Sequence, residues 1–431
     1  MSPIPLAEPH RLTATAARAA IAAGRLTAVA LAEACLARAE AREPVVHAFV
    51  HLDPAQALAQ AEAADRAGCP GRLGGLPVGV KDVIDTADMP TQMNSPIWAG
   101  WRPRGDAACV AWARAEGAIV LGKTVTTEFA TRHPGPTANP HDPARTPGGS
   151  SSGSAAAVAD CMLSLAFATQ TAGSIIRPAA YCGVVGYKPS YGLISRIGMK
   201  IMSDSLDTMG VMARSVADCA LFAGAVAGRD LGDPETAPAR PPRVGLCRGP
   251  TWDRALPETA VLLDQVAVAL SRAGAAVLPR ELPLSFNALV EAHPLVMNIE
   301  SARAIGWELT TRRAQVSAVL RSRLEPALAE PPARLDWARG IFADCQTAFP
   351  AVLGDLDVLV TPSAPGEAPE GLGFTGDPAF NLVWTSLHVP CVTVPAGRGP
   401  HGLPLGIQVV GPRGADAQVL AWARWVQAAL G

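Results

Sequence analysis

A glycine- and serine-rich stretch between residues 146 and 192 constrains this chain more than any other part of its sequence. Two glycines and three serines stand near its start, and a second Gly-Ser pair, Gly173-Ser174, follows a small-residue segment. Glycines let a backbone approach a ligand closely, and a serine hydroxyl can act as a nucleophile. This composition is typical of a site that holds a reactive hydroxyl against backbone N–H donors.

Short apolar strands alternate with helices along much of the chain. Residues 14–41 have helical periodicity with a break at Gly24, and residues 76–80 form a short buried strand that ends at Lys81-Asp82. The alternation predicts an α/β fold, with a mixed or parallel sheet covered by helices on both faces. Further helices are expected at 55–67, 107–116, 154–165, 215–227, 257–272, 415–429 and over most of 284–349, strands at 118–121, 164–169, 243–247, 276–278, 355–360, 391–394 and 405–410, and a loop at 195–210.

The composition is that of a globular protein with a large core, since 49% of the 431 residues are hydrophobic and 17% are charged. The formal net charge of −2 argues against a broad basic face for nucleic acid. Nine cysteines without a CxxC pair indicate neither a disulfide framework nor a zinc site. We find neither a secretory signal nor an apolar run long enough for a membrane, so we expect a cytoplasmic protein without a membrane partner.

Residues 117–124, GAIVLGKT, match the phosphate-loop pattern GxxxxGK[ST]. A phosphate loop follows a strand and opens a helix, whereas here a helix precedes Gly117 and the segment between the glycines is itself strand-like. We therefore reject a nucleotide site. The metal-binding patterns HExxH and DxDxDG are absent, as is a GxSxG pentapeptide around Ser174, so we expect no metal, no cofactor and no α/β-hydrolase elbow.

A serine activated by a lysine is the chemistry that remains. None of the eight histidines lies in a recognisable catalytic context. Lys81 ends an apolar strand, where a solvated strand terminus is the ordinary interpretation. If Lys81 is buried instead, its pKa must fall from about 10.4 to near 7, which costs roughly 4–5 kcal/mol and leaves a neutral amine that can act as a base. A second hydroxyl would then relay the proton between Lys81 and Ser174.

Six sequence blocks, spread nearly from end to end of the chain, carry a resemblance to a known family. They are LGGLPVGVKD at 73–82, GAIVLGKT at 117–124, TANPHDPARTPGGSSSGSAAAVA at 137–159, TQTAGSIIRPAAYCGVVGYKPSYG at 169–192, SLDTMGVMARSVAD at 205–218 and GLPLGIQVVG at 402–411. In these blocks the chain resembles the amidase signature family. The glycine-serine stretch combined with the upstream GVKD is the most specific part of the resemblance, and residues 284–349 are the least typical.

The resemblance implies a Ser–cis-Ser–Lys catalytic set. Ser174 would be the nucleophile, Ser150 the bridging serine with a cis peptide bond, and Lys81 the base that accepts the proton through Ser150. Attack on an amide carbonyl would give an acyl-enzyme that water hydrolyses. The developing oxyanion would face the backbone N–H groups of Thr171, Ala172, Gly173 and Ser174.

Three features depart from the usual pattern of the family. Gln170 stands where the family often has an aspartate, and Ala172 stands where it has a glycine. Because Ala172 carries a Cβ, it should avoid positive φ. The arginine of the family commonly lies two residues after the nucleophile, but here Ile176 takes that place and Arg177 follows. Supporting roles are assigned to Ser151, in the relay or as a loop serine, to Arg177, as a structural cation, and to Asp207, as a loop anchor.

The resemblance also implies the amidase signature fold, one α/β/α domain over residues 1–431 with a central mixed sheet covered by helices on both faces. Within it we expect an N-terminal helical segment at 10–68, the signature core at 70–220 and a variable, mostly helical region at 280–350 that shapes the substrate pocket.

The pocket should form from the parts of the chain that are least fixed by motif. These parts are residues 89–98, 131–136, 295–345 and 363–388. The aromatic and histidine candidates are Trp98, Trp101, His133, Trp384 and His388. For each of them a place in the core or at the rim is the favoured alternative, and the identity of the substrate stays open.

Three functions fit the sequence. The first is a stand-alone amidase that cleaves a small or medium carboxamide and releases ammonia or an amine. The second is the glutaminase subunit of a glutamyl-tRNA amidotransferase, which works in a complex. The third is a non-catalytic binding relative, which the joint presence of Lys81, Ser150 and Ser174 disfavours. The expected partner is a small-molecule amide, and a homodimer is one of the oligomeric states left open.

Overall fold

The computed structural model describes residues 8–236 and 238–431. Within these residues, eleven strands form one mixed sheet in the order β1-β3-β2-β4-β6-β5-β10-β11-β9-β7-β8. β2 pairs in parallel with β3 and β4, and β7 pairs in parallel with β8 and β9, whereas the other neighbours are antiparallel. The strands are β1 (Phe49–Leu52), β2 (Pro77–Lys81), β3 (Ile119–Thr124), β4 (Leu165–Gln170), β5 (Val185–Lys188), β6 (Thr208–Ala213), β7 (Arg243–Leu246), β8 (Ala276–Pro279), β9 (Val358–Pro362), β10 (Cys391–Arg398) and β11 (Pro404–Val410).

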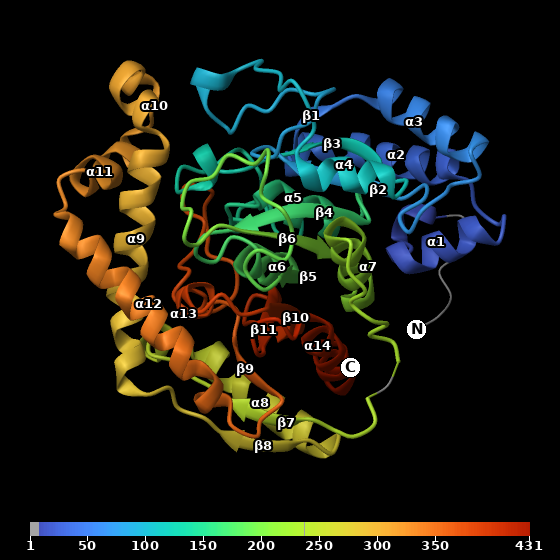
Figure 1. The fold of residues 1–431 in the computed structure, drawn as a ribbon. Coiled ribbons are helices and arrows are strands. Elements are labelled where there is room, and N and C mark those ends of the chain that lie inside the picture. The colour runs from blue at the N-terminus through green and yellow to red at the C-terminus, as the bar shows by residue number, and fades with distance from the viewer. Residues whose placement is uncertain (1–7, 237) are drawn as a thin grey trace.

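Helices cover both faces of this sheet, so the expected fold class is confirmed (Figure 1). α5 and α6 contact each other over the middle strands, and α7, α14 and α8 form a second connected group. The helices are α1 (Ala14–Ala22), α2 (Ala28–Val46), α3 (Pro54–Arg66), α4 (Ala108–Ala115), α5 (Ser152–Ala159), α6 (Ile176–Cys182), α7 (Val216–Ala227), α8 (Pro257–Arg272), α9 (Leu289–Ala304), α10 (Gly306–Thr311), α11 (Ala318–Ala327), α12 (Pro332–Leu353), α13 (Leu382–Ser386) and α14 (Asp416–Leu430).

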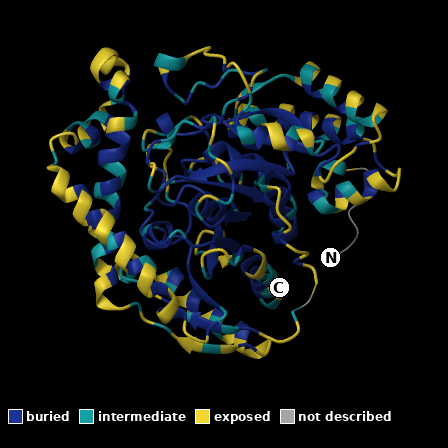
Figure 2. Cartoon of the chain, in the orientation of Figure 1, coloured by how far each residue is buried: buried dark blue, intermediate teal, exposed yellow. Residues whose placement is uncertain are grey.

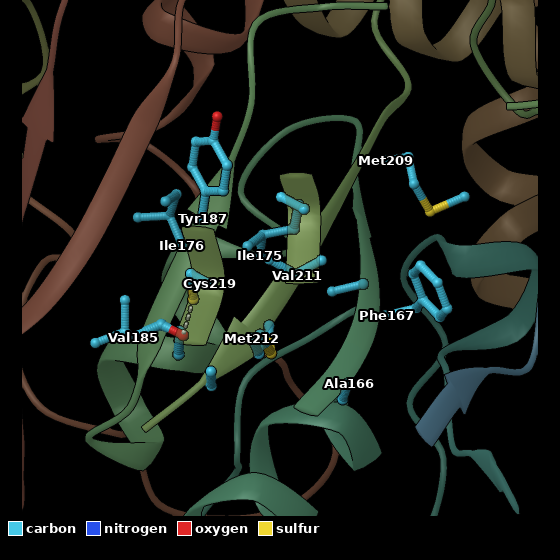
Figure 3. Packing of buried hydrophobic residues seen from close by; sticks show 14 of the residues in the cluster. Ala166, Phe167, Ile175, Ile176, Val185, Tyr187, Met209, Val211, Met212 and Cys219 are labelled. Carbon is cyan, nitrogen blue, oxygen red and sulfur yellow. Dashed lines mark hydrogen bonds between the residues drawn. The ribbon is translucent and has the colours of Figure 1, made fainter. Parts of the chain in front are cut away.

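The centre of the sheet is buried on both faces. All residues of β2, β3, β4 and β6 are buried, which matches their nearly continuous runs of apolar and small side chains. Figure 3 shows how Phe167, Val185, Tyr187 and Val211 extend from neighbouring strands into this core. Ile175, just before α6, packs among them. The segment around Gly173-Ser174 is therefore anchored to the buried core of the sheet through Ile175.

α9, α10, α11 and α12 form a helical layer beside the sheet, drawn in yellow and orange in Figure 1. α9 contacts α10, α11, α12 and α13. Figure 2 shows exposed residues on the outward sides of these helices and buried ones on the inward sides. This layer corresponds to the mostly helical region predicted at 284–349. Within the described ranges, no helix combines the length and apolar character needed to cross a bilayer.

The motif resembling a phosphate loop is a buried strand. Residues Ile119–Thr124 form β3, and no helix follows it directly. Lys123 is fully buried, and its Nζ lies 3.5 Å from Asp82 Oδ1. Lys123, the lysine of this motif, therefore forms an internal ion pair and is not free to bind a phosphate, which agrees with the rejection of a nucleotide site.

Five of the described helices and strands were not predicted from the sequence: β1, β5, β6, α6 and α13. β6 begins at Thr208 inside the segment expected to be a loop, and its run TMGVMA lacks the alternation that marks a half-buried strand. The predicted helix at 154–165 is shorter, because α5 ends at Ala159 and Cys161 adopts a positive φ of 58°. In both cases tertiary packing decides the backbone where the local pattern is ambiguous.

Candidate active site

Lys81 ends β2 and is completely buried. Its Nζ lies 2.7 Å from Ser150 Oγ, 3.0 Å from Ser151 Oγ and 2.7 Å from Thr169 Oγ1. Lys81 is therefore not a solvated strand terminus, which is the ordinary interpretation of its position in the sequence. β2 and β4 are parallel neighbours, so the carboxyl ends of both strands bring Lys81 and Thr169 to the same edge of the sheet.

The environment of Lys81 favours its neutral form. Burial lowers the pKa of Lys81 well below its ordinary range, and the negative charge of Asp207 opposes this shift. Its hydrogen-bonding partners are uncharged oxygens, which compensate an ammonium less well than a carboxylate does. A neutral amine beside a serine hydroxyl can accept a proton from it.

Ser150 lies in the loop that leads into α5, and the peptide bond between Gly149 and Ser150 is cis. The loop is held on two sides. Thr127 N–H donates to Ser150 O at 3.3 Å, and Arg177 Nη2 donates to Gly149 O at 2.7 Å. Arg177 thus supports the backbone next to Ser150, in keeping with its assignment as a structural cation.

Ser174 lies at the wall of a cavity, with 7% of its surface exposed. Its carbonyl oxygen accepts a hydrogen bond from Ser151 N–H at 3.4 Å, which ties the two serine-bearing segments together. Among the described residues, no hydrogen bond joins the Ser174 hydroxyl to Ser150 or Lys81. The structure thus brings Lys81, Ser150 and Ser151 into direct contact and places Ser174 beside them through the backbone.

The turn from Thr171 to Ser174 presents free backbone donors. In the described part of the chain, none of its four N–H groups donates to a protein acceptor. The next two N–H groups are occupied instead, because Gln170 Oε1 accepts from Ile175 N–H at 2.8 Å and from Ile176 N–H at 3.1 Å. Such a row of free donors can bind a developing oxyanion.

Two departures from the family's pattern, Gln170 and Ala172, are compatible with the backbone and the hydrogen bonds of this turn. Ala172 avoids positive φ, as its Cβ requires. Gly173 also lacks a positive φ, but a Cβ there would collide with the side chain of Asn381. Gln170 takes the place of an acid and still accepts two hydrogen bonds through its amide oxygen, while its Nε2 donates to Thr385 Oγ1 at 3.0 Å.

Thr171 is fixed from two further directions. Its hydroxyl donates to Asp207 Oδ1 at 2.6 Å, and Asp207 also accepts from Met202 N–H and Ser203 N–H. Burial raises the pKa of Asp207, while these hydrogen bonds counteract the shift. On the other side, His293 Nε2 of α9 lies 2.9 Å from Thr171 O. Burial lowers the pKa of His293 to about 4, so its neutral ring donates to that carbonyl.

The cavity beside Ser174 has a volume of about 630 Å³ including its open mouth. Its walls come from the turn at 171–174, from α9 and α11, and from the loops at 130–132 and 375–378. Three of the four segments expected to form the pocket contribute, and 89–98 does not. The lining residues are Ala130, Thr131, Arg132, Thr171, Ala172, Ser174, Arg177, Met202, Met297, Asn298, Ser301, Leu320, Arg323, Leu324, Thr375 and Pro378.

None of the five aromatic and histidine candidates lines this cavity, which agrees with the alternative favoured for each of them. Trp98 and Trp101 pack edge to face at the surface with ring centroids 5.4 Å apart, and Trp384 is buried against Phe349. His388 stacks on a tyrosine ring and bonds to a carbonyl, and His133 is exposed. Their large side chains are used for packing and for the rim.

Thr169, Arg132, Arg323 and His293 were missed as parts of the site. Thr169 directly precedes Gln170, and the parallel pairing of β2 with β4 is the signal that could have placed it beside Lys81. The other three residues lie in segments without motifs, and only the tertiary fold brings them to the cavity or to Thr171. Among the residues that the structure describes, no group of three or more His, Cys, Asp or Glu side chains could hold a metal ion.

The family model Amidase matches residues 30–420, and the chain therefore belongs to the amidase signature family of amide-hydrolysing enzymes. A glutamyl-tRNA(Gln) amidotransferase subunit of Chloroflexus aurantiacus is 34% identical to it, over 96% of each chain. The peptide amidase of Stenotrophomonas maltophilia is 32% identical over 97% of each chain, with a TM-score of 0.83. A crystal structure described as an amidase gives a TM-score of 0.88 at 30% identity, covering 97% of this chain and all of the other.

Proposed function

We propose that this enzyme hydrolyses a carboxamide through an acyl-enzyme on Ser174. Neutral Lys81 takes a proton from Ser150 while Ser150 takes the proton of Ser174, whose oxygen then attacks the amide carbonyl. The carbonyl oxygen becomes negative and is stabilised by the N–H groups of the turn at 171–174. The same relay returns the proton to the nitrogen as the C–N bond breaks, which releases ammonia or an amine.

The second half of the reaction uses the same groups. Water loses a proton through Ser150 to Lys81 and attacks the acyl carbon, and the proton returns to Ser174 as the carboxylic acid leaves. The observation that carries this proposal is the contact of the buried Lys81 amine with Ser150 Oγ at 2.7 Å, next to Ser151, whose N–H donates to Ser174 O. Ser151 and Thr169 hold the amine of Lys81 in place.

Ammonia release from a broad set of carboxamides tests the proposal. Wild-type enzyme should turn over at least one class of amide, and Ser174→Ala should reduce kcat by orders of magnitude without unfolding the protein. Removal of a triad residue in a comparable serine enzyme costs about 10⁴- to 10⁶-fold. Full activity in Ser174→Ala would refute the assignment of the nucleophile.

A second candidate function is that of a glutaminase subunit in a glutamyl-tRNA amidotransferase. The observation that favours it is the full-length similarity to proteins named as subunits of glutamyl-tRNA(Gln) amidotransferases. A complex purified from its own cells that contains other subunits and has tRNA-dependent glutaminase activity would establish it. A chain that purifies alone, as a monomer or a homodimer, and hydrolyses amides without tRNA would exclude it.

A further inference from the structure

Three arginines converge on the cavity beside Ser174 from three different parts of the fold. Arg177 extends from α6, Arg323 from α11, and Arg132 from the loop that precedes the glycine-serine stretch. Residues this far apart in sequence gather their like charges in one place against electrostatic repulsion. Such a cluster is stabilised by internal carboxylates, by solvent or by a bound anion.

The guanidinium groups retain unused donors. Arg177 is only 5% exposed, and its Nη2 bonds to Gly149 O and Thr375 Oγ1, while its buried Nε and Nη1 have no partner. Arg323 Nη1 is likewise buried without a partner. Within residues 8–236 and 238–431, none of the three arginines forms a salt bridge. A buried guanidinium with free donors is costly unless an acceptor reaches it.

The walls of the cavity hold no acid that could balance these charges. None of the sixteen lining residues is an aspartate or a glutamate. Asp377 is the neighbouring carboxylate, but it already accepts from Arg254 Nη1 at 2.7 Å and from Ala379 N–H at 3.0 Å. Burial lowers the pKa of Arg132 to about 10; the charges of Arg323 and Arg177 contribute to this shift, and the charge of Asp377 opposes it. Three arginines thus face a lining without a carboxylate, and the nearby Asp377 is shared with Arg254, so the cavity is cationic.

We propose that the cavity binds a carboxylate of the substrate, so that the enzyme acts on anionic carboxamides, such as monoamides of dicarboxylic acids. This inference rests on the proposed function of Ser174. Arginine donors match a carboxylate geometrically, and the bond is charge-assisted. The absence of an acid in the wall also means that an ammonium group next to the carboxylate has no partner. A simple anionic amide should therefore be preferred over asparagine or glutamine.

Matched substrates test the inference. We would compare a series of dicarboxylic monoamides of increasing chain length with neutral amides in which an isopropyl group replaces the carboxylate. Succinamate pairs with 4-methylpentanamide, and asparagine differs from succinamate only by its ammonium group. The best anionic amide should exceed its neutral counterpart in kcat/KM by about 10- to 100-fold, as expected for one or more charge-assisted bonds. Equal kcat/KM values for both members of every pair would overturn the inference.

Substitutions of the arginines test which of them cause the preference for anionic amides. Arg323→Met and Arg132→Met should each reduce the ratio of kcat/KM for the anionic amide to that for its neutral counterpart by about 10-fold, and Arg323→Lys should retain more of the ratio. Arg321→Met is the matched control, because Arg321 lies on the same helix but not at this cavity. An unchanged ratio in both methionine variants would contradict the assignment. Arg177 is left intact because it also bonds to Gly149.

A binding experiment separates failure of the inference from failure of the proposed reaction. Calorimetric titration of Ser174→Ala with succinamate and its longer homologues measures anion binding without turnover. Tighter binding of the anionic amides than of the neutral ones, lost in Arg323→Met, supports the site even if no amide is hydrolysed. Hydrolysis of neutral amides, together with equal binding of both kinds, would preserve the reaction and refute the carboxylate site.

Discussion

Two lysines are buried on neighbouring strands, and their surroundings distinguish them. Lys123 lies 3.5 Å from Asp82, and burial lowers its pKa to about 8 while that carboxylate opposes the shift. Lys81 contacts hydroxyl groups instead of a carboxylate, and its pKa falls well below the ordinary range. Lys81 is therefore the lysine suited to act as a base, and Lys123 is suited to fix the backbone after β2.

Replacing Lys81 with alanine should reduce kcat by about 10²- to 10⁴-fold, the range that general-base catalysis contributes. The fold should survive, since the variant removes a buried amine that burial disfavours in its charged form. Rates of ammonia release and circular dichroism, measured on the same preparation, check both expectations. Retention of full activity in the folded variant would show that another group serves as the base.

Thr169→Val tests how the amine of Lys81 is positioned. The Thr169 hydroxyl accepts a hydrogen bond from Nζ at 2.7 Å, and loss of this acceptor disfavours the ammonium form. The pKa of Lys81 should therefore fall further, and because the proposed relay requires the neutral amine, the acidic limb of the pH–rate profile should move to lower pH. If the variant changed only the stability of the protein and left the acidic limb of the pH–rate profile unmoved, Thr169 would contribute packing and not the positioning of the amine.

At the scale of elements, the turn between β4 and α6 depends on one side chain. Gln170 Oε1 accepts from Ile175 N–H and Ile176 N–H, the donors at the start of α6. Gln170→Leu leaves both buried donors unpaired and should lower the free energy of unfolding by about 2–4 kcal/mol. Gln170→Glu keeps the acceptor and is the control. Chemical denaturation of the three proteins gives the comparison, and equal stabilities would contradict this role.

The sequence allowed accurate prediction of elements with a clear local pattern. The helix at 257–272 and the strand that ends at Lys81 lie where they were expected. β5 and β6 escaped prediction because their glycine-containing runs are stabilised by pairing with distant strands. The arginines of the pocket escaped prediction for the same reason. Arg132 and Arg323 are far apart in sequence, and only the tertiary fold brings them to one cavity, so no local sequence pattern indicates their proximity.

At the level of the whole molecule, His293 links the helical layer of α9–α12 to the turn at 171–174. It is completely buried on α9 and donates to Thr171 O, and its pKa is lowered from 6.5 to about 4. In the unfolded chain the imidazole binds a proton at higher pH than in the folded one. The unfolded state therefore gains stability as pH falls from about 6.5 to about 4, and the folded protein loses up to about 3 kcal/mol over that window.

His293→Gln should flatten this dependence, since glutamine keeps an amide donor for Thr171 O but does not titrate. The variant should lose less stability than the wild type between pH 7 and pH 4, with a difference of up to about 3 kcal/mol. Urea denaturation at a series of pH values measures it. Parallel stability curves for the two proteins would show that the proton uptake lies elsewhere.

Covalent labelling tests whether Ser174 is the nucleophile and whether Lys81 activates it. The native enzyme would be treated with a fluorophosphonate, digested, and analysed by mass spectrometry to locate the modified residue. We predict one adduct on Ser174, absent in Ser174→Ala and formed much more slowly in Lys81→Ala, because the neutral amine of Lys81 activates the hydroxyl through Ser150. An adduct on another serine would contradict the assignment of the nucleophile, and labelling of Ser174 at the same rate in Lys81→Ala would contradict its activation by Lys81.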